Sequence, residues 1–247
     1  MAIYLLPSFF SLTNLFFGFL SISFCFQRKY SWAAFFVLIG AILDGFDGII
    51  ARLTKTQSDF GIELDSLADA ISFGAAPSLL LYFWALKAAG PAGKFFSFVY
   101  LAAGILRLAR YNIRTKMQPD RKHYTGLTIP SAAVFISSII FLHPQALNSK
   151  PIAFLLAVVT LLVSSCMIST IKYKNFLSFN IRKKINIKTA LIIAVIVSSL
   201  IFYRKIFLFC FFTINVLSGP ATYVYNFLKK KIQKRRQEKR IPSQKTA

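Results

Sequence analysis

The stretch DGFDGIIARLTKTQSDFGIELDSLAD, residues 44–69, decides how the rest of the chain is interpreted. Apolar runs flank it on both sides, WAAFFVLIGAIL at 32–43 and SLLLYFWALKAA at 78–89. We therefore expect two hydrophobic helices joined by a turn near 55–60. The stretch also holds six of the eight acidic residues of the protein, namely Asp44, Asp47, Asp59, Glu63, Asp65 and Asp69.

Four of these aspartates share helix faces in pairs. Asp44 and Asp47 are three residues apart, and Asp65 and Asp69 are four apart. Four carboxylates in hydrocarbon cost on the order of 10 kcal/mol, and two of them ~4 Å apart repel by about 4 kcal/mol at an effective dielectric of 20. Divalent cations remove both costs, and Mg²⁺ and Mn²⁺ prefer carboxylate oxygens. We therefore predict that all four aspartates hold two Mg²⁺ or Mn²⁺ ions, a pair suited to binding a pyrophosphate.

Small residues and an arginine follow the first acidic pair. Gly48 and Ala51 leave a helix face almost bare, and Arg52 adds a guanidinium one turn beyond. A nucleotide that lies against a helix needs such a bare surface and a cation near its phosphates. Two alternatives stay open: small residues at this spacing also favour close helix packing, and Arg52 and Lys55 can pair with the acids at the membrane surface.

The pattern D-x-x-D-G-x-x-A-R-x8-G-x3-D-x3-D runs from Asp44 to Asp69 without a departure and resembles the signature of the CDP-alcohol phosphatidyltransferases. The phosphatidylglycerophosphate synthases of that family usually carry Pro where this chain has Ser66, and Lys where it has Ala70. The similarity covers most of residues 1–180. Four segments resemble the phosphatidylserine synthase branch: LDSLADAISFGAAP (64–77), LRLARYN (106–112), GLTIPSAA (126–133) and CMISTIKY (166–173).

The resemblance implies an integral-membrane enzyme that transfers a phosphatidyl group from CDP-diacylglycerol to the hydroxyl of L-serine and releases CMP. It implies that Asp69, the last Asp of the motif, takes the proton of that hydroxyl. It also implies that Gly61 joins Gly48, Ala51 and Arg52 in a nucleotide-binding wall, and that the protein forms a homodimer. Glycerol 3-phosphate or inositol phosphate as the acceptor, an intramembrane prenyltransferase and a divalent-cation transporter are the alternatives.

Three basic residues further along the chain are candidates for binding the substrates. Arg107 and Arg110 lie three residues apart at the end of the fourth predicted helix. A guanidinium binds a carboxylate or a lipid phosphate with two parallel hydrogen bonds, although both arginines also suit anchoring at the cytoplasmic surface. Lys172 is a further candidate for a phosphate or for the serine carboxylate.

At 247 residues and 56% hydrophobic content, the chain is predicted to be an all-α integral membrane protein, a polytopic helical bundle of six to eight transmembrane helices. No basic residue precedes the first apolar segment, which favours a retained helix over a cleaved signal. We expect a membrane domain at 1–180, an additional C-terminal transmembrane hairpin at 181–228 and a basic cytoplasmic tail at 229–247. The approximate helix cores are 8–27, 32–54, 64–86, 95–113, 128–143, 151–171, 187–203 and 206–228.

The net charge of +22 comes from basic residues that lie between and after the apolar segments. This distribution argues against nucleic acid as a partner and for anionic membrane lipids, above all at the segment KKKIQKRRQEKR, residues 229–240. Most Lys and Arg residues fall on the same side of the membrane as the turn near 55–60. The positive-inside rule therefore places that turn, both termini and the active site at the cytoplasmic face, and the resemblance implies a bacterial inner membrane.

Overall fold

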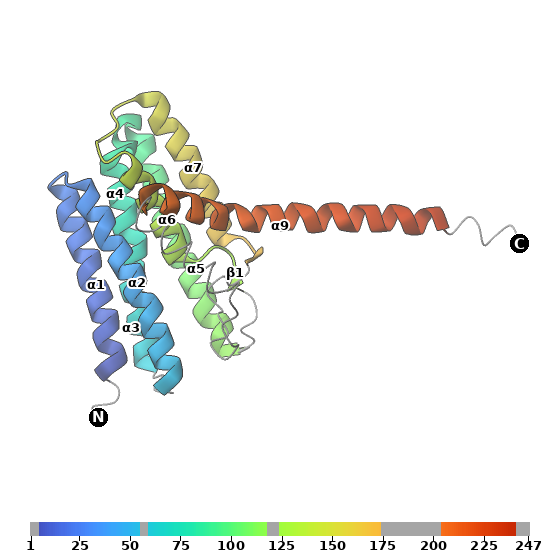
Figure 1. The fold of residues 1–247 in the computed structure, drawn as a ribbon, viewed down its shortest axis with the longest axis horizontal. Coiled ribbons are helices and arrows are strands. Elements are labelled where there is room, and N and C mark those ends of the chain that lie inside the picture. The colour runs from blue at the N-terminus through green and yellow to red at the C-terminus, as the bar shows by residue number, and fades with distance from the viewer. Residues whose placement is uncertain (1–4, 55–58, 118–123, 174–203, 241–247) are drawn as a thin grey trace, which may run out of the picture.

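The computed structural model describes residues 5–54, 59–117, 124–173 and 204–240 and shows a bundle of long helices (Figure 1). Its two strands pair in antiparallel register and are two residues long each. In chain order the elements are α1 (Leu5–Phe26), α2 (Tyr30–Thr54), α3 (Asp59–Asp69), the π-helix η2 (Ala70–Ala75), α4 (Ala76–Trp84), the 3-10 helix η3 (Leu86–Ala89), α5 (Pro91–Met117), β1 (Tyr124–Thr125), α6 (Ile129–Leu142), α7 (Lys150–Ile168), β2 (Lys172–Tyr173) and α9 (Arg204–Arg240).

Among the described residues, five helices are long and apolar enough to cross a membrane. Two shorter apolar helices accompany them, so seven of the eight predicted cores are helical, and the remaining one, 187–203, lies outside the described residues. The predicted all-α polytopic membrane fold is thereby confirmed. The five are Phe9–Phe26, Phe60–Trp84, Pro91–Arg114, Lys150–Ile168 and Lys205–Tyr223, and the shorter two are Tyr30–Phe46 and Ile129–Leu142.

A π-helical turn, η2, directly follows the second acidic pair. Pro77 has no N–H to donate and crowds the carbonyl four residues earlier, that of Phe73. The Tyr100 hydroxyl of α5 donates to the Phe73 carbonyl at 3.1 Å, which satisfies it. The Ala76 N–H reaches back five residues to the Ile71 carbonyl, as a π-helix requires. The helix therefore continues across the proline with a local widening beside the acids.

Helix α1 packs closely against η2 because small side chains meet there. A Cβ on Gly18 would lie 2.4 Å from the Ser72 Oγ, so a larger residue at 18 would push the two helices apart. The Ser72 hydroxyl donates to the Asn14 carbonyl at 2.9 Å. One turn of α1 is therefore fixed against the chain segment that carries the second acidic pair.

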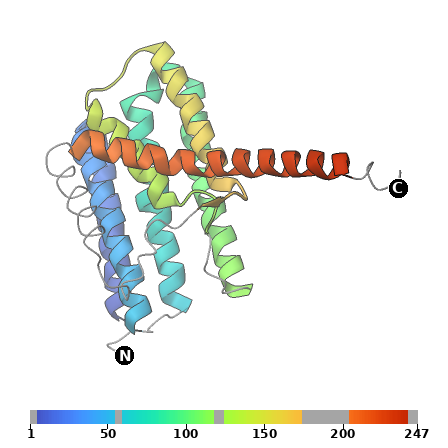
Figure 2. The same cartoon turned by 45° about the vertical axis from the view of Figure 1, so that its right-hand side comes forward.

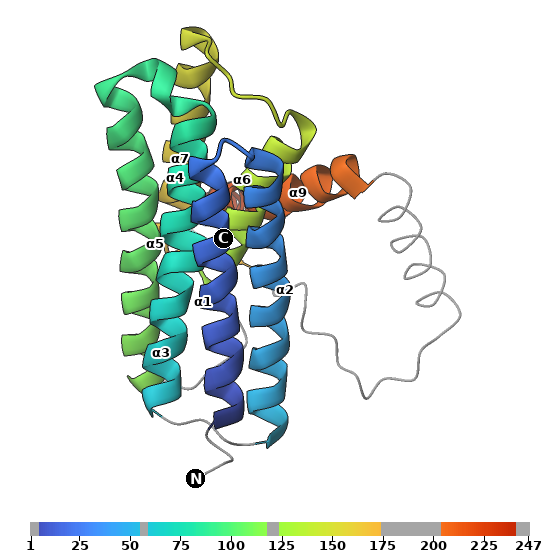
Figure 3. The same cartoon turned by 90° about the vertical axis from the view of Figure 1, so that its left-hand side faces the viewer.

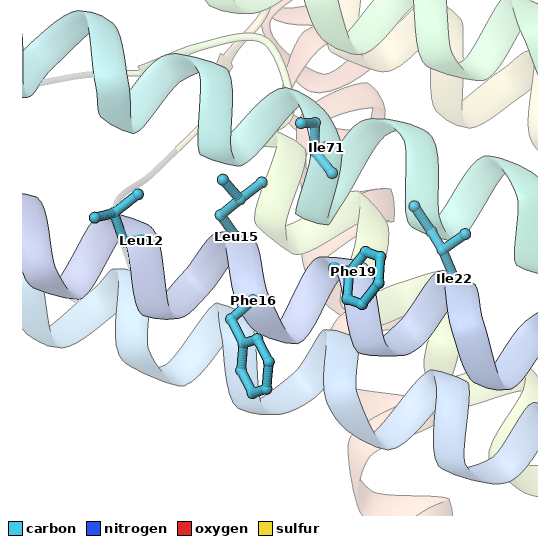
Figure 4. A pocket seen from close by; sticks show the side chains of 6 residues that line it. All are labelled: Leu12, Leu15, Phe16, Phe19, Ile22 and Ile71. Carbon is cyan, nitrogen blue, oxygen red and sulfur yellow. The ribbon is translucent and has the colours of Figure 1, made fainter.

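An apolar groove of about 430 Å³ runs along α1 and η2 (Figure 4), lined by Leu12, Leu15, Phe16, Phe19, Ile22 and Ile71. Phe16 and Phe19 are 55% and 62% exposed. Apolar surface of this extent is unusual on a water-soluble monomer, whereas a membrane helix presents it to hydrocarbon. This side of α1 therefore faces lipid.

Helix α9 crosses the bundle at a large angle instead of running along it (Figures 1 and 2). It packs on α6, where the Phe135 and Phe209 rings stack with centroids 6.4 Å apart and Val216 is buried. The helix continues unbroken to Arg240, so the segment predicted as a basic tail is helical as far as that residue. The predicted hairpin at 181–228 stays a prediction, because most of its first half lies outside the described residues.

Candidate active site

The acidic pairs lie toward one end of the bundle. Figure 3 shows the N-terminal end of α1, the C-terminal end of α2 and the N-terminal end of α3 together at that end, with the C-terminal end of α5 beside them. Asp44 and Asp69 each lie ten residues inside their helices from this end, which is about 15 Å along the helix axis. A site there is recessed from the helix ends.

Three of the four predicted metal ligands converge. Asp44 of α2 and Asp65 and Asp69 of α3 each offer a carboxylate oxygen, and these oxygens all lie within 4.8 Å of one another. Asp69 is 7% exposed, and the other two are half-buried. Like charges this close repel strongly in a poorly solvated site, and three hard oxygen ligands suit a divalent cation. The donor set therefore fits such an ion.

The other predicted site residues on these helices are placed only by their backbone. Asp47, Gly48, Ala51 and Arg52 lie on the last turns of α2, and their side chains fall outside the described residues. Gly61 lies near the start of α3 and is half-buried. Their assignments as the fourth metal ligand and as the nucleotide wall stay predictions.

Helix α1 contributes two polar side chains that hold the acids and that the sequence analysis missed. The Ser11 hydroxyl donates to Asp65 Oδ1 at 3.4 Å, and the Asn14 amide donates to Asp69 Oδ1 at 3.1 Å. With Gly18, these residues recur every three or four positions in an otherwise apolar segment. That period on one helix face was the available signal, and it indicates a polar stripe turned toward α3.

The end of α5 is tied to α3 between the acids. The Asn112 amide donates to the Ser66 hydroxyl at 2.8 Å, and this hydroxyl donates in turn to the Ile62 carbonyl at 3.0 Å. A proline at position 66 would offer no hydroxyl to Asn112. The residue that distinguishes the two family branches in sequence thus makes a specific contact with the helix that carries both arginines.

Arg107 of α5 faces the acids. It is only 6% exposed, and its charge acts on Asp44. Its guanidinium also lies 5.9 Å from the centroid of the Tyr111 ring, within reach of a cation–π interaction. A buried guanidinium beside carboxylates reduces their mutual repulsion and presents a cation to an anionic substrate.

Arg110 is directed to another part of the bundle. Its guanidinium donates to the carbonyls of Met167, Ile168 and Ser169, at the C-terminal end of α7. The last carbonyls of a helix have no partner within the helix, and a cation there also complements the helix dipole. Three hydrogen bonds thus give Arg110 a structural role that its spacing from Arg107 did not predict, and its role in substrate binding stays a prediction. The side chain of Lys172, in β2, falls outside the described residues.

Comparison with known proteins identifies the family. The profile described as CDP-alcohol phosphatidyltransferase matches residues 4–165. The chain belongs to the CDP-alcohol phosphatidyltransferase family. This match spans all three clustered aspartates, both arginines of α5 and the polar stripe of α1, and it confirms the resemblance found in the motif. Membership in this family favours a membrane-bound transferase over a prenyltransferase or a cation transporter.

Several relatives of this CDP-alcohol phosphatidyltransferase carry one name, CDP-diacylglycerol–serine O-phosphatidyltransferase. The protein of that name from Helicobacter pylori is 38% identical over 207 residues, which cover 83% of this chain and 84% of the relative. The one from Bacillus subtilis is 34% identical over 171 residues, 69% of this chain and 90% of the relative. The one from Methanocaldococcus jannaschii is 36% identical over 140 residues, 57% of this chain and 62% of the relative.

Proposed function

We propose that the protein transfers the phosphatidyl group of CDP-diacylglycerol to L-serine. In this reaction the serine hydroxyl oxygen bonds to the phosphorus that carries diacylglycerol, the bond from this phosphorus to the bridging oxygen of the pyrophosphate breaks, and CMP leaves. The observation that carries the proposal is the convergence of Asp44, Asp65 and Asp69 in a membrane bundle that belongs to this family. The shared name of its relatives supports serine as the acceptor.

The clustered carboxylates suit a metal-assisted transfer. Asp44, Asp65 and Asp69, with Asp47 as the fourth ligand, would hold two Mg²⁺ or Mn²⁺ ions. The chemistry supplied by such ions, when bound, is neutralisation of the pyrophosphate charge and stabilisation of CMP as it leaves. The protein contributes by holding the carboxylates of two helices close together before the substrate arrives.

Asp69 is the residue that we assign to the proton of the serine hydroxyl. It is the most buried of the three acids, and the Asn14 amide fixes one of its oxygens. Its second oxygen can accept a proton as the new bond to phosphorus forms. A carboxylate that is held in place by a neighbour needs little reorganisation to do so.

The substrate is bound by residues on both sides of the acids. Gly48, Ala51, Arg52 and Gly61 would form the wall against which the nucleotide lies. Arg107 suits the serine carboxylate or the lipid phosphate, because its guanidinium is buried beside the acids. The lipid tails would extend into the bilayer while the head group stays in the recessed site, with Arg110 and Lys172 as further predicted contacts.

The proposal places the protein in the inner membrane of a bacterium, with the site open to the cytoplasm. Serine and the CMP product are soluble, so a site at that face exchanges both with the cytoplasm while the lipids remain in the bilayer. Assembly as a homodimer, contact with anionic membrane lipids and the absence of a nucleic-acid partner complete the proposal.

An acceptor screen tests the reaction. Purified protein is supplied with CDP-diacylglycerol and Mg²⁺ or Mn²⁺, and CMP and the lipid product are measured with L-serine, glycerol 3-phosphate, inositol phosphate or no acceptor. We expect CMP and phosphatidylserine with L-serine only. Equal turnover with another acceptor would overturn the serine assignment. Asp69→Asn should abolish turnover while Ser21→Ala, a buried change elsewhere on α1, leaves it intact.

A further inference from the structure

Asn14 lies where three helices meet beneath the acids. It is 0% exposed, and its amide nitrogen donates to Asp69 Oδ1 at 3.1 Å. On its other side is Gly40 of α2, four residues before Asp44 and therefore on the same helix face as that acid. A Cβ on Gly40 would lie 2.9 Å from Asn14 Oδ1. The amide thus fills the space between the helices that supply the two acidic pairs.

The orientation of this amide is set by what each end meets. An ionised carboxylate only accepts hydrogen bonds, so the NH₂ end of Asn14 must face Asp69. Its Oδ1 is buried, and no donor in the described part of the chain reaches it. A buried acceptor without a hydrogen bond costs free energy. An apolar residue of similar size would avoid that cost, so folding alone does not account for an asparagine at this position.

The main chain of Asn14 is also held. Its carbonyl accepts the Ser72 hydroxyl at 2.9 Å, and the close approach of Gly18 to Ser72 one turn later keeps α1 at this depth. Since both the side chain and its backbone are fixed, the amide can determine the direction of the Asp69 carboxylate. This is the arrangement in which a residue outside the metal site orients a metal ligand.

We propose that Asn14 is a positioning residue that orients the Asp69 carboxylate for the divalent metal site, with Gly40 providing the space for its side chain. The inference rests on the proposed function, because it assumes that Asp69 is a ligand. Loss of such an outer contact typically lowers metal affinity by about 10- to 100-fold.

The test measures Mn²⁺ binding without turnover. The purified full-length protein is freed of metal and titrated with Mn²⁺, and free Mn²⁺ is followed by electron paramagnetic resonance. Asn14→Leu keeps the volume and removes the donor, so we expect Mn²⁺ affinity to fall by about 10- to 100-fold while the melting temperature of the metal-free protein does not fall. Ser21→Ala is the matched control, since this buried serine of α1 also has a hydroxyl without a hydrogen bond among the described residues. It should bind Mn²⁺ like the wild type.

A double-mutant cycle keeps the proposal testable if the leucine variant folds poorly. Gly40→Ala should weaken Mn²⁺ binding in the wild-type background, because its Cβ displaces the Asn14 amide. In the Asn14→Ala background the same change should cause no further loss. Mn²⁺ affinity unchanged in Asn14→Leu, or equal losses from Gly40→Ala in both backgrounds, would overturn the positioning role. Failure of the wild type itself to bind Mn²⁺ would instead overturn the proposed metal site.

Discussion

The contact between α1 and α3 differs in kind from the contact between α6 and α9. In the first, Ser11 and Asn14 donate hydrogen bonds to two carboxylates. In the second, the Phe135 and Phe209 rings stack. Apolar contacts stabilise in proportion to buried area and tolerate repacking, whereas buried acids and amides must keep their partners. The polar contact should therefore matter mainly for activity and the aromatic contact mainly for stability.

Removal of metal should have the largest effect at the polar contact. We expect a chelator to abolish CMP release and added Mg²⁺ or Mn²⁺ to restore it, because clustered carboxylates without cations repel each other and the pyrophosphate. Bound metal should also raise the melting temperature, since a ligand at 100 times its Kd stabilises by about 2.7 kcal/mol. Turnover that persists after complete chelation would break the comparison at its functional end.

Asp65→Asn comes next in size. It keeps the shape of the side chain and removes one charge from the cluster, so kcat for CMP release should fall by about 10²- to 10³-fold, as for loss of one group that stabilises charge in a transition state. The metal-free melting temperature should not fall, because the change relieves repulsion. Glu63→Gln, on an exposed position of the same helix, serves as the control and should keep normal turnover.

The two arginines of α5 allow a direct test of function against stability. Arg107→Lys keeps the charge and loses the planar fork, so we expect kcat/KM to fall about tenfold, or 1.4 kcal/mol. Arg110→Lys loses most of its three carbonyl hydrogen bonds, so it should lower the unfolding free energy by about 1.5–3 kcal/mol at nearly constant kcat/KM. A fall in kcat/KM for Arg110→Lys at constant stability would instead support its predicted role in substrate binding.

The smallest expected effect lies at the aromatic contact. Phe209 is only partly buried against the core. Phe209→Ala should therefore cost about 1–2 kcal/mol of stability, less than the 3–5 kcal/mol of a fully buried phenylalanine. CMP release per folded molecule should stay the same. Ile214→Ala, on an exposed position of α9, is the control for stability, and its melting temperature should match the wild type. Lost turnover in Phe209→Ala would mean that α9 shapes the active site.

The acidic cluster was predictable from sequence because its logic is local. Helical spacing assigns Asp65 and Asp69 to one face, and the cost of burying charge requires that they share a partner with Asp44. The hairpin needs only a turn between two apolar segments to bring the faces together. No knowledge of the more distant helices enters this step.

The supporting residues were not predictable in the same way. The role of Asn14 depends on which face of α1 meets α3, and a largely apolar helix has no hydrophobic face to indicate this. Arg107 and Arg110 share a face by spacing, but only the position of α7 separates their partners. These assignments depend on tertiary packing, which the sequence specifies without displaying it.

The course of α9 was also beyond the sequence. Its apolar segment satisfies the length and hydropathy of a transmembrane helix, and neither property fixes a crossing angle. Its continuation through 229–240 follows from residues such as Lys, Arg and Gln, which are good helix formers. Charge alone predicted a tail for this segment, whereas helix propensity favours the observed helix.

Diffraction from crystals grown with Mn²⁺ is the most direct test of the central claim, that aspartates of two neighbouring membrane helices bind the same divalent cations. Data collected near the manganese absorption edge locate the ions independently of the protein density. The account predicts an anomalous peak about 2 Å from oxygens of Asp44, Asp65 and Asp69. Crystals that contain Mn²⁺ elsewhere, with these three carboxylates turned away from one another, would contradict it.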